Sequence, residues 1–307
     1  MSLETDLILD RRRLKRRLVF WRSFAVLAVV VALVAALRLG NGAIGGAHLA
    51  RLSVTGIITE DRKLVEAVNA LAKDDSVKAL IVSINSPGGS VAGGESLHDA
   101  IGRVAAKKPV VAVMGGLAAS AGYMVALPAQ RIFAREATLT GSIGVLLESG
   151  EISGLLAKLG ITPQVLTSGP LKDQPSLTRP LTPEGRQVLQ GLIMDMYDQF
   201  VTMVADGRHM DADRVRQLAD GRAYTGRQAL SLGLVDAIGD ETTAREWLAK
   251  EKGVPTTLGV EDVSTTGFAG RALAGSLAPL FDGAWKMLIS QSLMLDGAWA
   301  LWHRPQE

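Results

Sequence analysis

A turn built from small residues, at positions 115–123, carries one aliphatic hydroxyl group, that of Ser120. The apolar, β-branched run at 109–114 precedes the turn and predicts a buried strand, and residues 124–127 predict the body of a short helix. Glycine and alanine on both sides of Ser120 allow backbone and substrate to approach closely. This geometry suits a nucleophile for acyl transfer. A tight strand-to-helix crossover without chemistry is the alternative interpretation.

A serine at its ordinary pKa needs a base, and histidine is the usual one. The chain has four histidines: His48 in a linker, His98 two turns into a predicted helix, His209 at the end of a polar stretch and His303 near the end of the sequence. None has an evident orienting carboxylate at a strand end. A Ser-His-Asp triad therefore stays open but has no support in the spacing.

Lysine is the other base used in acyl transfer, provided that burial favours its uncharged form. Lys172 has the best context, because it lies in a loop bounded by glycine and proline, whereas Lys63 and Lys73 lie on charged helical faces. An ordinary solvated lysine is the alternative for Lys172.

The elements that must position these residues alternate between strand and helix. We expect strands at 51–58, 77–84 and 110–114, and helices at 61–72 and 90–106. This order, with short loops, predicts an α/β fold with a parallel sheet. Residues 85–89 (Asn-Ser-Pro-Gly-Gly) and 115–123 follow consecutive strands, so they should face each other at the carboxyl edge of the sheet.

The second half of the chain predicts further elements. A short strand is expected at 131–133, a long helix capped by Thr182 runs to about residue 207, and a helix within 224–236 ends at Gly233. A helix ending near Lys252 should close the globular part.

Basic residues gather immediately before an apolar run at 18–37, which is long enough to cross a bilayer. We expect a cytosolic basic tail at 1–17, a single transmembrane anchor at 18–38, a linker at 39–50 and an exported domain at 51–252. A cleaved signal peptide is the competing interpretation, but its apolar region is normally shorter. Residues 253–307 form a tail, for which an amphipathic segment and a docked helix both stay open.

Composition excludes some other classes of protein. The 307-residue chain has no cysteine, so it has neither a disulfide framework nor a thiolate metal site. The basic cluster has no interleaved aromatic residues, which argues against a nucleic-acid partner.

Five motifs taken together resemble the SppA-type serine proteases, the bacterial signal peptide peptidase A family, in its short single-repeat form. They are residues 85–89, 116–123, 140–145, 168–173 and 224–236. The resemblance covers about residues 50–250. The first motif alone also occurs in the Clp protease catalytic subunit.

This resemblance implies Ser120 as nucleophile, Lys172 as general base, and an oxyanion hole from the loop of Gly88 and Gly89 with the amide of Ala121. It implies a crotonase- and Clp-protease-like spiral of ββα repeats, without cofactor or metal. Family members form homo-oligomers whose serine and lysine come from different repeats or subunits. Two departures concern the groove: Ala121 stands where glycine is usual, and Met124 stands where a second aromatic residue is common.

We therefore expect a serine endopeptidase in the bacterial cytoplasmic membrane, with its catalytic domain outside the cytoplasm, that hydrolyses peptides such as released signal peptides. Three alternatives stay open. A Clp-like triad would place a histidine near residues 144–148, where none occurs. An acyl-CoA enzyme of the crotonase fold would not need the anchor or Lys172. A non-catalytic membrane scaffold would leave Ser120 unreactive towards serine probes.

Overall fold

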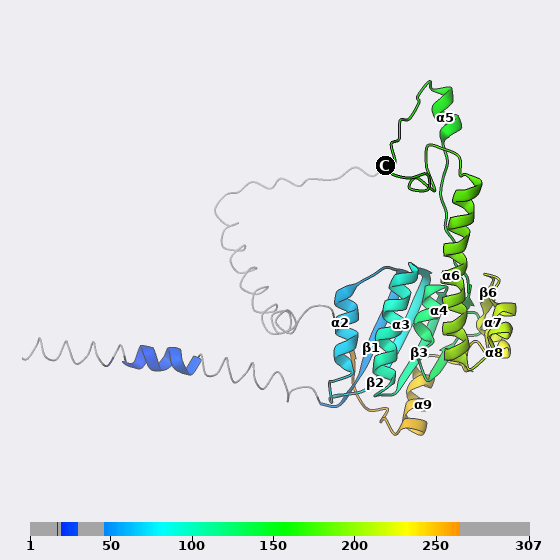
Figure 1. Ribbon diagram of the computed structural model, residues 1–307. Coiled ribbons are helices and arrows are strands. Elements are labelled where there is room, and N and C mark those ends of the chain that lie inside the picture. Colours follow the sequence, from blue (N-terminus) through cyan, green and yellow to red (C-terminus); the bar gives the residue numbers. More distant parts are fainter. Residues whose placement is uncertain (1–16, 18–19, 30–45, 265–307) are drawn as a thin grey trace, which may run out of the picture.

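A computed structural model describes residues 17, 20–29 and 46–264 (Figure 1). Its strands are β1 (His48–Ile58), β2 (Val77–Gly89), β3 (Val110–Ala119), β4 (Arg131–Ala134), β5 (Leu139–Gly141), β6 (Ala223–Thr225), β7 (Ala237–Ile238) and β8 (Val260–Asp262). Its helices are α2 (Arg62–Leu71), α3 (Val91–Ala105), α4 (Ala121–Ala126), α5 (Ser153–Lys158), α6 (Pro183–Arg208), α7 (Ala212–Leu218), α8 (Gly226–Leu232) and α9 (Glu241–Lys252).

The strands form one sheet in the order β6-β5-β3-β2-β1-β8, and β4 pairs with β3 and β7 beside this path. All of these pairs are parallel except β5 with β6, which is antiparallel. The expectation of a parallel sheet is confirmed for β1 to β4, and β6, which runs antiparallel to β5, makes the sheet as a whole mixed. Between β5 and β6 the chain passes through α5, α6 and α7, and β6 then runs antiparallel to β5 at the edge of the sheet.

Alternate side chains of the central strands point to opposite faces of the sheet, as the pleat requires. Leu80, Val82 and Ile84 pack into the larger core, under the helical layer formed by α2, α3, α4 and α6. Ala79 and Ile81 pack into the smaller core on the other face, which α9 covers. This double coverage explains why the strand sequences are continuously apolar.

Two expected loops are strands for most of their length. Residues 85–89 belong to β2, because Ile57 and Ile58 of β1 pair with Gly88 and Gly89. Strand β3 continues to Ala119, because Ser86 pairs with Ala118 and β5 pairs with residues 117–119. The turn that carries Ser120 is therefore shorter than the sequence suggested.

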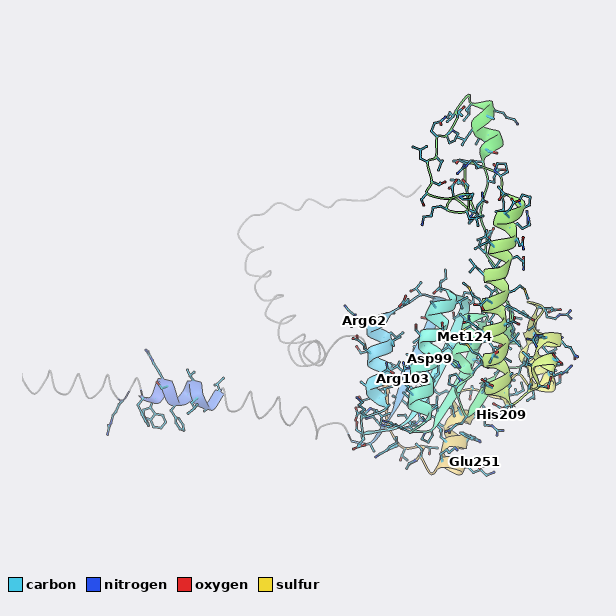
Figure 2. All side chains as sticks on the ribbon, viewed as in Figure 1. Arg62, Asp99, Arg103, Met124, His209 and Glu251 are labelled. Atoms are coloured by element: carbon cyan, nitrogen blue, oxygen red, sulfur yellow. The ribbon has the colours of Figure 1, made fainter. Side chains whose placement is uncertain are left out.

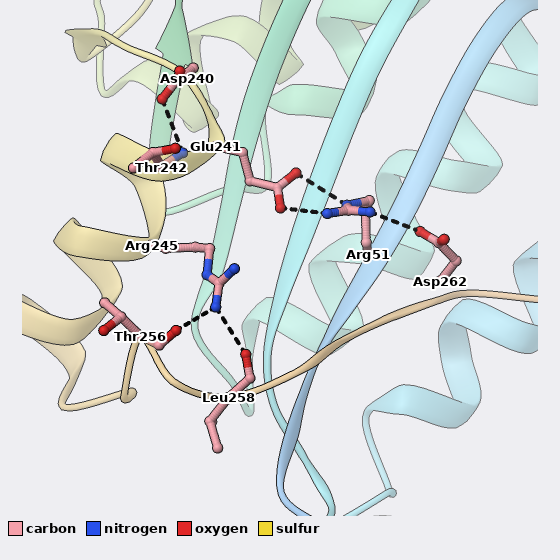
Figure 3. Close-up of polar contacts among 8 residues, drawn as sticks. All are labelled: Arg51, Asp240, Glu241, Thr242, Arg245, Thr256, Leu258 and Asp262. Carbon is pink, nitrogen blue, oxygen red and sulfur yellow. Dashed lines mark hydrogen bonds and ion pairs between the residues drawn. The ribbon is translucent and has the colours of Figure 1, made fainter.

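The sheet extends beyond both expected limits of the globular domain. Strand β1 begins at His48, inside the expected linker, and β8 lies inside the expected tail and pairs with residues 49–51. Arg51 fastens both β8 and α9 to the sheet (Figure 3): its guanidinium pairs with Glu241 at 2.6 Å and with Asp262 at 3.5 Å.

Helix α6 begins where the sequence predicted, since the Thr182 hydroxyl accepts a hydrogen bond from the Gly185 amide at 3.0 Å. Its second half packs on the domain through Phe200, Val201 and Val204. Its first half projects away from the sheet and, with residues 145–182 and α5, forms an arm (Figure 1).

The expected anchor at 18–38 is described only at residues 20–29, which are helical, and its other residues lie outside the described part. Among the helices that the structure does describe, none has both the length and the apolar character needed to cross a membrane.

Candidate active site

Ser120 occupies a sharp turn between β3 and α4. Its backbone angles, φ 54° and ψ −124°, are unusual for a residue with a side chain. Its amide donates to the Gly141 carbonyl at 2.9 Å, and its own carbonyl accepts from the amides of Tyr123 and Met124. These bonds hold the turn in a strained shape that leaves the hydroxyl partly exposed at the edge of the sheet.

Gly88 lies directly against this turn. A Cβ atom on Gly88 would be 2.8 Å from the Cβ of Ser120 and 3.0 Å from the amide nitrogen of Ala121, and its φ is +105°. A Cβ on Gly89 would lie 1.9 Å from the Ile58 carbonyl oxygen. Both positions therefore require glycine, which brings the loop of β2 and the serine together as the sequence predicted.

The amides expected to form the oxyanion hole differ in whether they are already hydrogen-bonded within the protein. Ala121 is the first residue of α4, where an amide has no acceptor within the helix. Ile58 pairs with Gly89, and Ser90 donates to the Ile58 carbonyl at 2.9 Å. In a parallel ladder this leaves the Gly89 amide directed away from β1, towards the side where β3 and Ser120 lie. The Gly88 amide is already engaged, since it donates to the Ser86 hydroxyl at 3.0 Å.

Ser120 opens onto a cleft of about 720 Å³. Its lining comes from the β2 loop, α3, the first residues of the arm, α6 and the segment before β6: Pro87, Gly89, Val91, Ser120, Ser142, Gly144, Val145, Leu146, Gln190, Ile193, Met194, Tyr197, Ala219, Asp220 and Gly221. The cleft is therefore mostly apolar, with the serine hydroxyls, backbone amides and one carboxylate at its edges. The Arg222 guanidinium bonds to that carboxylate and holds the pKa of Asp220 below its usual value.

Among the described residues, no histidine lines this cleft. His48 lies in β1 beside Glu261, and His98 contacts Asp99 on α3. His209 ends α6 on the side farthest from the arm (Figure 2). The three described histidines are thus placed away from Ser120, and His303 lies outside the described residues.

Lys172 lies in the arm, in a turn where its amide donates to the Gly169 carbonyl at 3.2 Å, and its side chain is exposed. It is not part of the lining of the cleft, and neither is any other lysine in the described part of the chain. The structure therefore brings Ser120, Gly88, Gly89 and Ala121 together within one chain, and it leaves Lys172 apart from them.

Sequence reasoning missed Ser142 as a site residue. Ser142 has a positive φ of 49°, its amide donates to the Arg222 carbonyl at 2.9 Å, and it lines the cleft with Ser120. The motif at 140–145 was the available signal. Only the pairing of β5 with the end of β3, which joins Gly141 to Ala119, places this second hydroxyl beside the first.

The helix behind the serine is anchored in the core. The Tyr123 hydroxyl donates to the Leu234 carbonyl at 2.7 Å, and complete burial raises the pKa of this phenol. Nearby, Arg208 and Asp236 pair at 2.6 Å, and Asp236 also accepts from the Ile132 amide at 2.7 Å. These contacts fix α4, and with it the position of Ser120, against the segment that follows α8.

Comparison with known proteins agrees with this geometry. The model of peptidase family S49 matches residues 103–255, and that of Clp protease matches residues 54–140. A Synechocystis sp. protein named as a protease is 42% identical over 207 residues, which cover 67% of this chain and 75% of the relative.

Two further relatives carry more specific names. An Enterococcus faecium protein named as a signal peptide peptidase SppA is 36% identical over 247 residues, covering 75% of this chain and 71% of the relative. Protease 4 of Salmonella typhi is 40% identical over 168 residues, covering 54% of this chain and 27% of the relative. The α/β fold is Clp-protease-like, and the chain belongs to peptidase family S49 as a serine-type peptidase of the SppA type.

Proposed function

We propose that Ser120 is the nucleophile of this peptidase and that Lys172, supplied by another copy of the chain, is its general base. One observation carries the proposal: the described lining of the cleft includes Ser120 and Gly89, but no lysine or histidine. Lys172 stands on an arm that projects from the domain. An arm that projects in this way can contact a neighbouring copy of the chain.

The exposed surface of the arm supports this assembly. Large apolar side chains face solvent along it, among them Leu146, Leu155, Leu159 and Leu166, the last of which is 99% exposed. Large apolar side chains exposed on one segment favour a contact site there. Docking on a second copy would cover these side chains and place Lys172 in a dry cleft, where the uncharged amine is favoured.

The reaction then follows from the groups in the cleft. The Lys172 amine takes the proton from the Ser120 hydroxyl as its oxygen attacks the peptide carbonyl, and the amides of Gly89 and Ala121 stabilise the oxyanion. The ammonium returns the proton to the leaving amine, which breaks the C–N bond and leaves an acyl-enzyme. A water molecule, deprotonated by the same amine, attacks the ester; the C–Oγ bond breaks, the acid leaves, and the ammonium returns the proton to the Ser120 oxygen.

Substrate class and location complete the proposal. The apolar side chains of Val91, Ile193 and Met194 in the cleft suit extended peptides with apolar residues, such as released signal peptides. The name of the Enterococcus faecium relative supports this class. The basic cluster and apolar run at the N-terminus support an anchor in the bacterial cytoplasmic membrane, with the catalytic domain on the outer side.

Mixing two inactive variants tests the shared site. We expect Ser120→Ala and Lys172→Ala of the full chain to be inactive alone, and co-refolded mixtures to regain activity, because one mixed contact in an assembly would join an intact serine to an intact lysine. Peptide hydrolysis is measured at fixed total protein. Lys158→Ala, another lysine of the arm, is the control and should keep normal turnover.

Two results would contradict the proposal. Normal hydrolysis by purified Lys172→Ala would exclude this lysine as the base. Inactive mixtures, despite co-assembly seen by cross-linking of differently tagged copies, would exclude a site shared between copies.

A further inference from the structure

Ser86 is a completely buried hydroxyl beside the proposed oxyanion hole, and no step of the mechanism above uses it. It lies in β2, two residues before Gly88. Its Oγ donates to the Gly56 carbonyl at 2.6 Å and accepts from the Gly88 amide at 3.0 Å. One side chain therefore joins the backbone of β1 to the glycine loop of β2.

The backbone on both sides of this hydroxyl departs from regular pairing. In β1, Gly56 has a φ of +69°, and the register with β2 shifts between Thr55 and Ile57. The Gly56 carbonyl is bonded outside the ordinary ladder, by a side chain of the neighbouring strand. The Ser86 hydroxyl makes that bond and, with its free acceptor position, also fixes the next irregular residue, Gly88.

Ser86 is also packed beneath the turn of the nucleophile. It pairs with Ala118 of β3, and a Cβ on Gly122 of α4 would lie 3.0 Å from the Ser86 carbonyl oxygen. Gly88, to which the hydroxyl is bonded, is in turn packed against Ser120, since a Cβ on Gly88 would lie 2.8 Å from the Ser120 Cβ. The hydroxyl is therefore tied to the backbone that faces the serine.

We propose that Ser86 is a positioning residue, whose hydroxyl fixes the Gly88 peptide so that the following amide, that of Gly89, points at the oxyanion. This inference rests on the proposed role of Ser120. A glycine with positive φ turns easily, so the plane of its peptide needs an external bond to stay in one orientation. Without the hydroxyl, the buried Gly88 amide loses its partner, and the loop turns to find another.

The effect should fall on the chemical step. The oxyanion exists only in the transition state and the intermediate, so a misdirected amide lowers kcat and leaves the KM nearly unchanged. Loss of one oxyanion donor costs on the order of 10²–10³ in rate, and partial misalignment should cost about tenfold or more. A purely structural role would instead lower the fraction of folded enzyme without changing the rate per site.

Ser86→Ala of the full-length protein is the test, and Thr138→Val is the matched control. Thr138 is also buried and also bridges two backbone groups, donating to the Gly115 carbonyl at 2.6 Å and accepting from the Arg135 amide at 2.9 Å, but neither partner lies in the glycine loop of β2. A fluorophosphonate titrated to its end point counts competent sites, and kcat and KM are then measured per site.

We expect Ser86→Ala to lower kcat per site by about tenfold or more, to change the KM by less than about twofold, and to slow fluorophosphonate labelling by a similar factor. Thr138→Val should lose thermal stability and keep its kcat per site. If Ser86→Ala does not fold, Ser86→Cys replaces it, because the thiol keeps the volume but hydrogen-bonds weakly, and the same loss of kcat is expected.

Three results would overturn the inference: a normal kcat per site in the Ser86 variant, a change confined to the KM, or an equal loss of kcat in Thr138→Val. Ser120→Ala distinguishes a failure of the proposed role of Ser86 from a failure of the proposed nucleophile. If Ser120→Ala is inactive and the Ser86 variant is normal, only the role of Ser86 fails. If Ser120→Ala hydrolyses peptides normally, the proposed nucleophile fails, and the role of Ser86 fails with it.

Discussion

Gly88 and Ser120, which are 32 residues apart in the sequence, lie so close that a Cβ on the glycine would be 2.8 Å from the Cβ of the serine. Real Cβ atoms do not approach other atoms this closely without a shift of one of them. The backbone of β2 and the turn after β3 can therefore approach this closely only because residue 88 has no side chain. The distance between the serine and the Gly89 amide depends on this contact.

Gly88→Ala should nearly abolish peptide hydrolysis, with a loss on the order of 10² or more in kcat/KM. The added methyl group meets Ser120 and also forces an alanine to a φ of +105°, so the loop must move away from the serine. Gly102→Ala is the control, because a Cβ there meets only Pro128, at 4.0 Å, in the last turn of α3. Full activity in Gly88→Ala would show that catalysis does not depend on the close contact between residue 88 and Ser120.

Ser120→Gly should be more stable than Ser120→Ala, although both lack the nucleophile. Relief of the strained backbone at φ 54° is worth about 1–3 kcal/mol, which exceeds the entropic cost of about 0.5–1 kcal/mol for a glycine. Urea unfolding of the two variants measures the difference. Ala119→Gly is the control: the preceding residue has no positive φ, so glycine there should destabilise the protein. If Ser120→Gly is less stable than Ser120→Ala, the backbone at Ser120 is not strained.

Met194→Ala should weaken the hydrolysis of peptides with large apolar residues. Met194 lines the cleft, and loss of its apolar contact should lower kcat/KM about tenfold, mainly through the KM. Peptides with small residues should be affected less. Met196, two residues further along α6, is also exposed but lies outside the cleft, so Met196→Ala should change neither value; equal effects of the two variants would place the substrate elsewhere.

Asp240→Asn should make the free energy of unfolding less sensitive to low pH. Asp240 begins α9 and accepts from the amides of Thr242 and Thr243, and the bond from Thr243 is the main cause that lowers the pKa of this carboxyl. A lowered folded-state pKa stabilises the fold above the ordinary value, about 3.9, and this contribution is lost as the pH falls through the folded pKa. Asparagine also caps helices but does not titrate.

Urea unfolding at pH 7 and pH 3 compares the wild type with this variant. The free energy of unfolding of Asp240→Asn should fall less between the two pH values. Asp75→Asn, an acidic residue whose side chain caps no helix, is the control. An equal fall in the wild type and Asp240→Asn would show that the cap does not contribute to the acid sensitivity.

The strands and helices near the serine could be predicted because their signals are local. Thr182 caps α6 and Gly233 ends α8 as expected, and both depend on hydrogen bonds within a few residues. The position of the Asn-Ser-Pro-Gly-Gly segment beside the serine could also be predicted, since both lie at the carboxyl ends of neighbouring parallel strands. The apolar runs of β2 and β3 required a sheet covered on both faces.

The tertiary structure decided the features that depend on contacts between distant segments. The return of β5 to the end of β3 brings Ser142 to the cleft, the entry of β8 extends the sheet, and the folding of residues 145–182 leaves Lys172 outside the lining of that cleft. The sequence by itself determined which side chain could attack a carbonyl and which backbone turn would carry it, because chain geometry and residue size act over a few neighbours. Strand pairing and packing decided which groups surround that side chain. Their energies depend on contacts between residues that are far apart in the sequence.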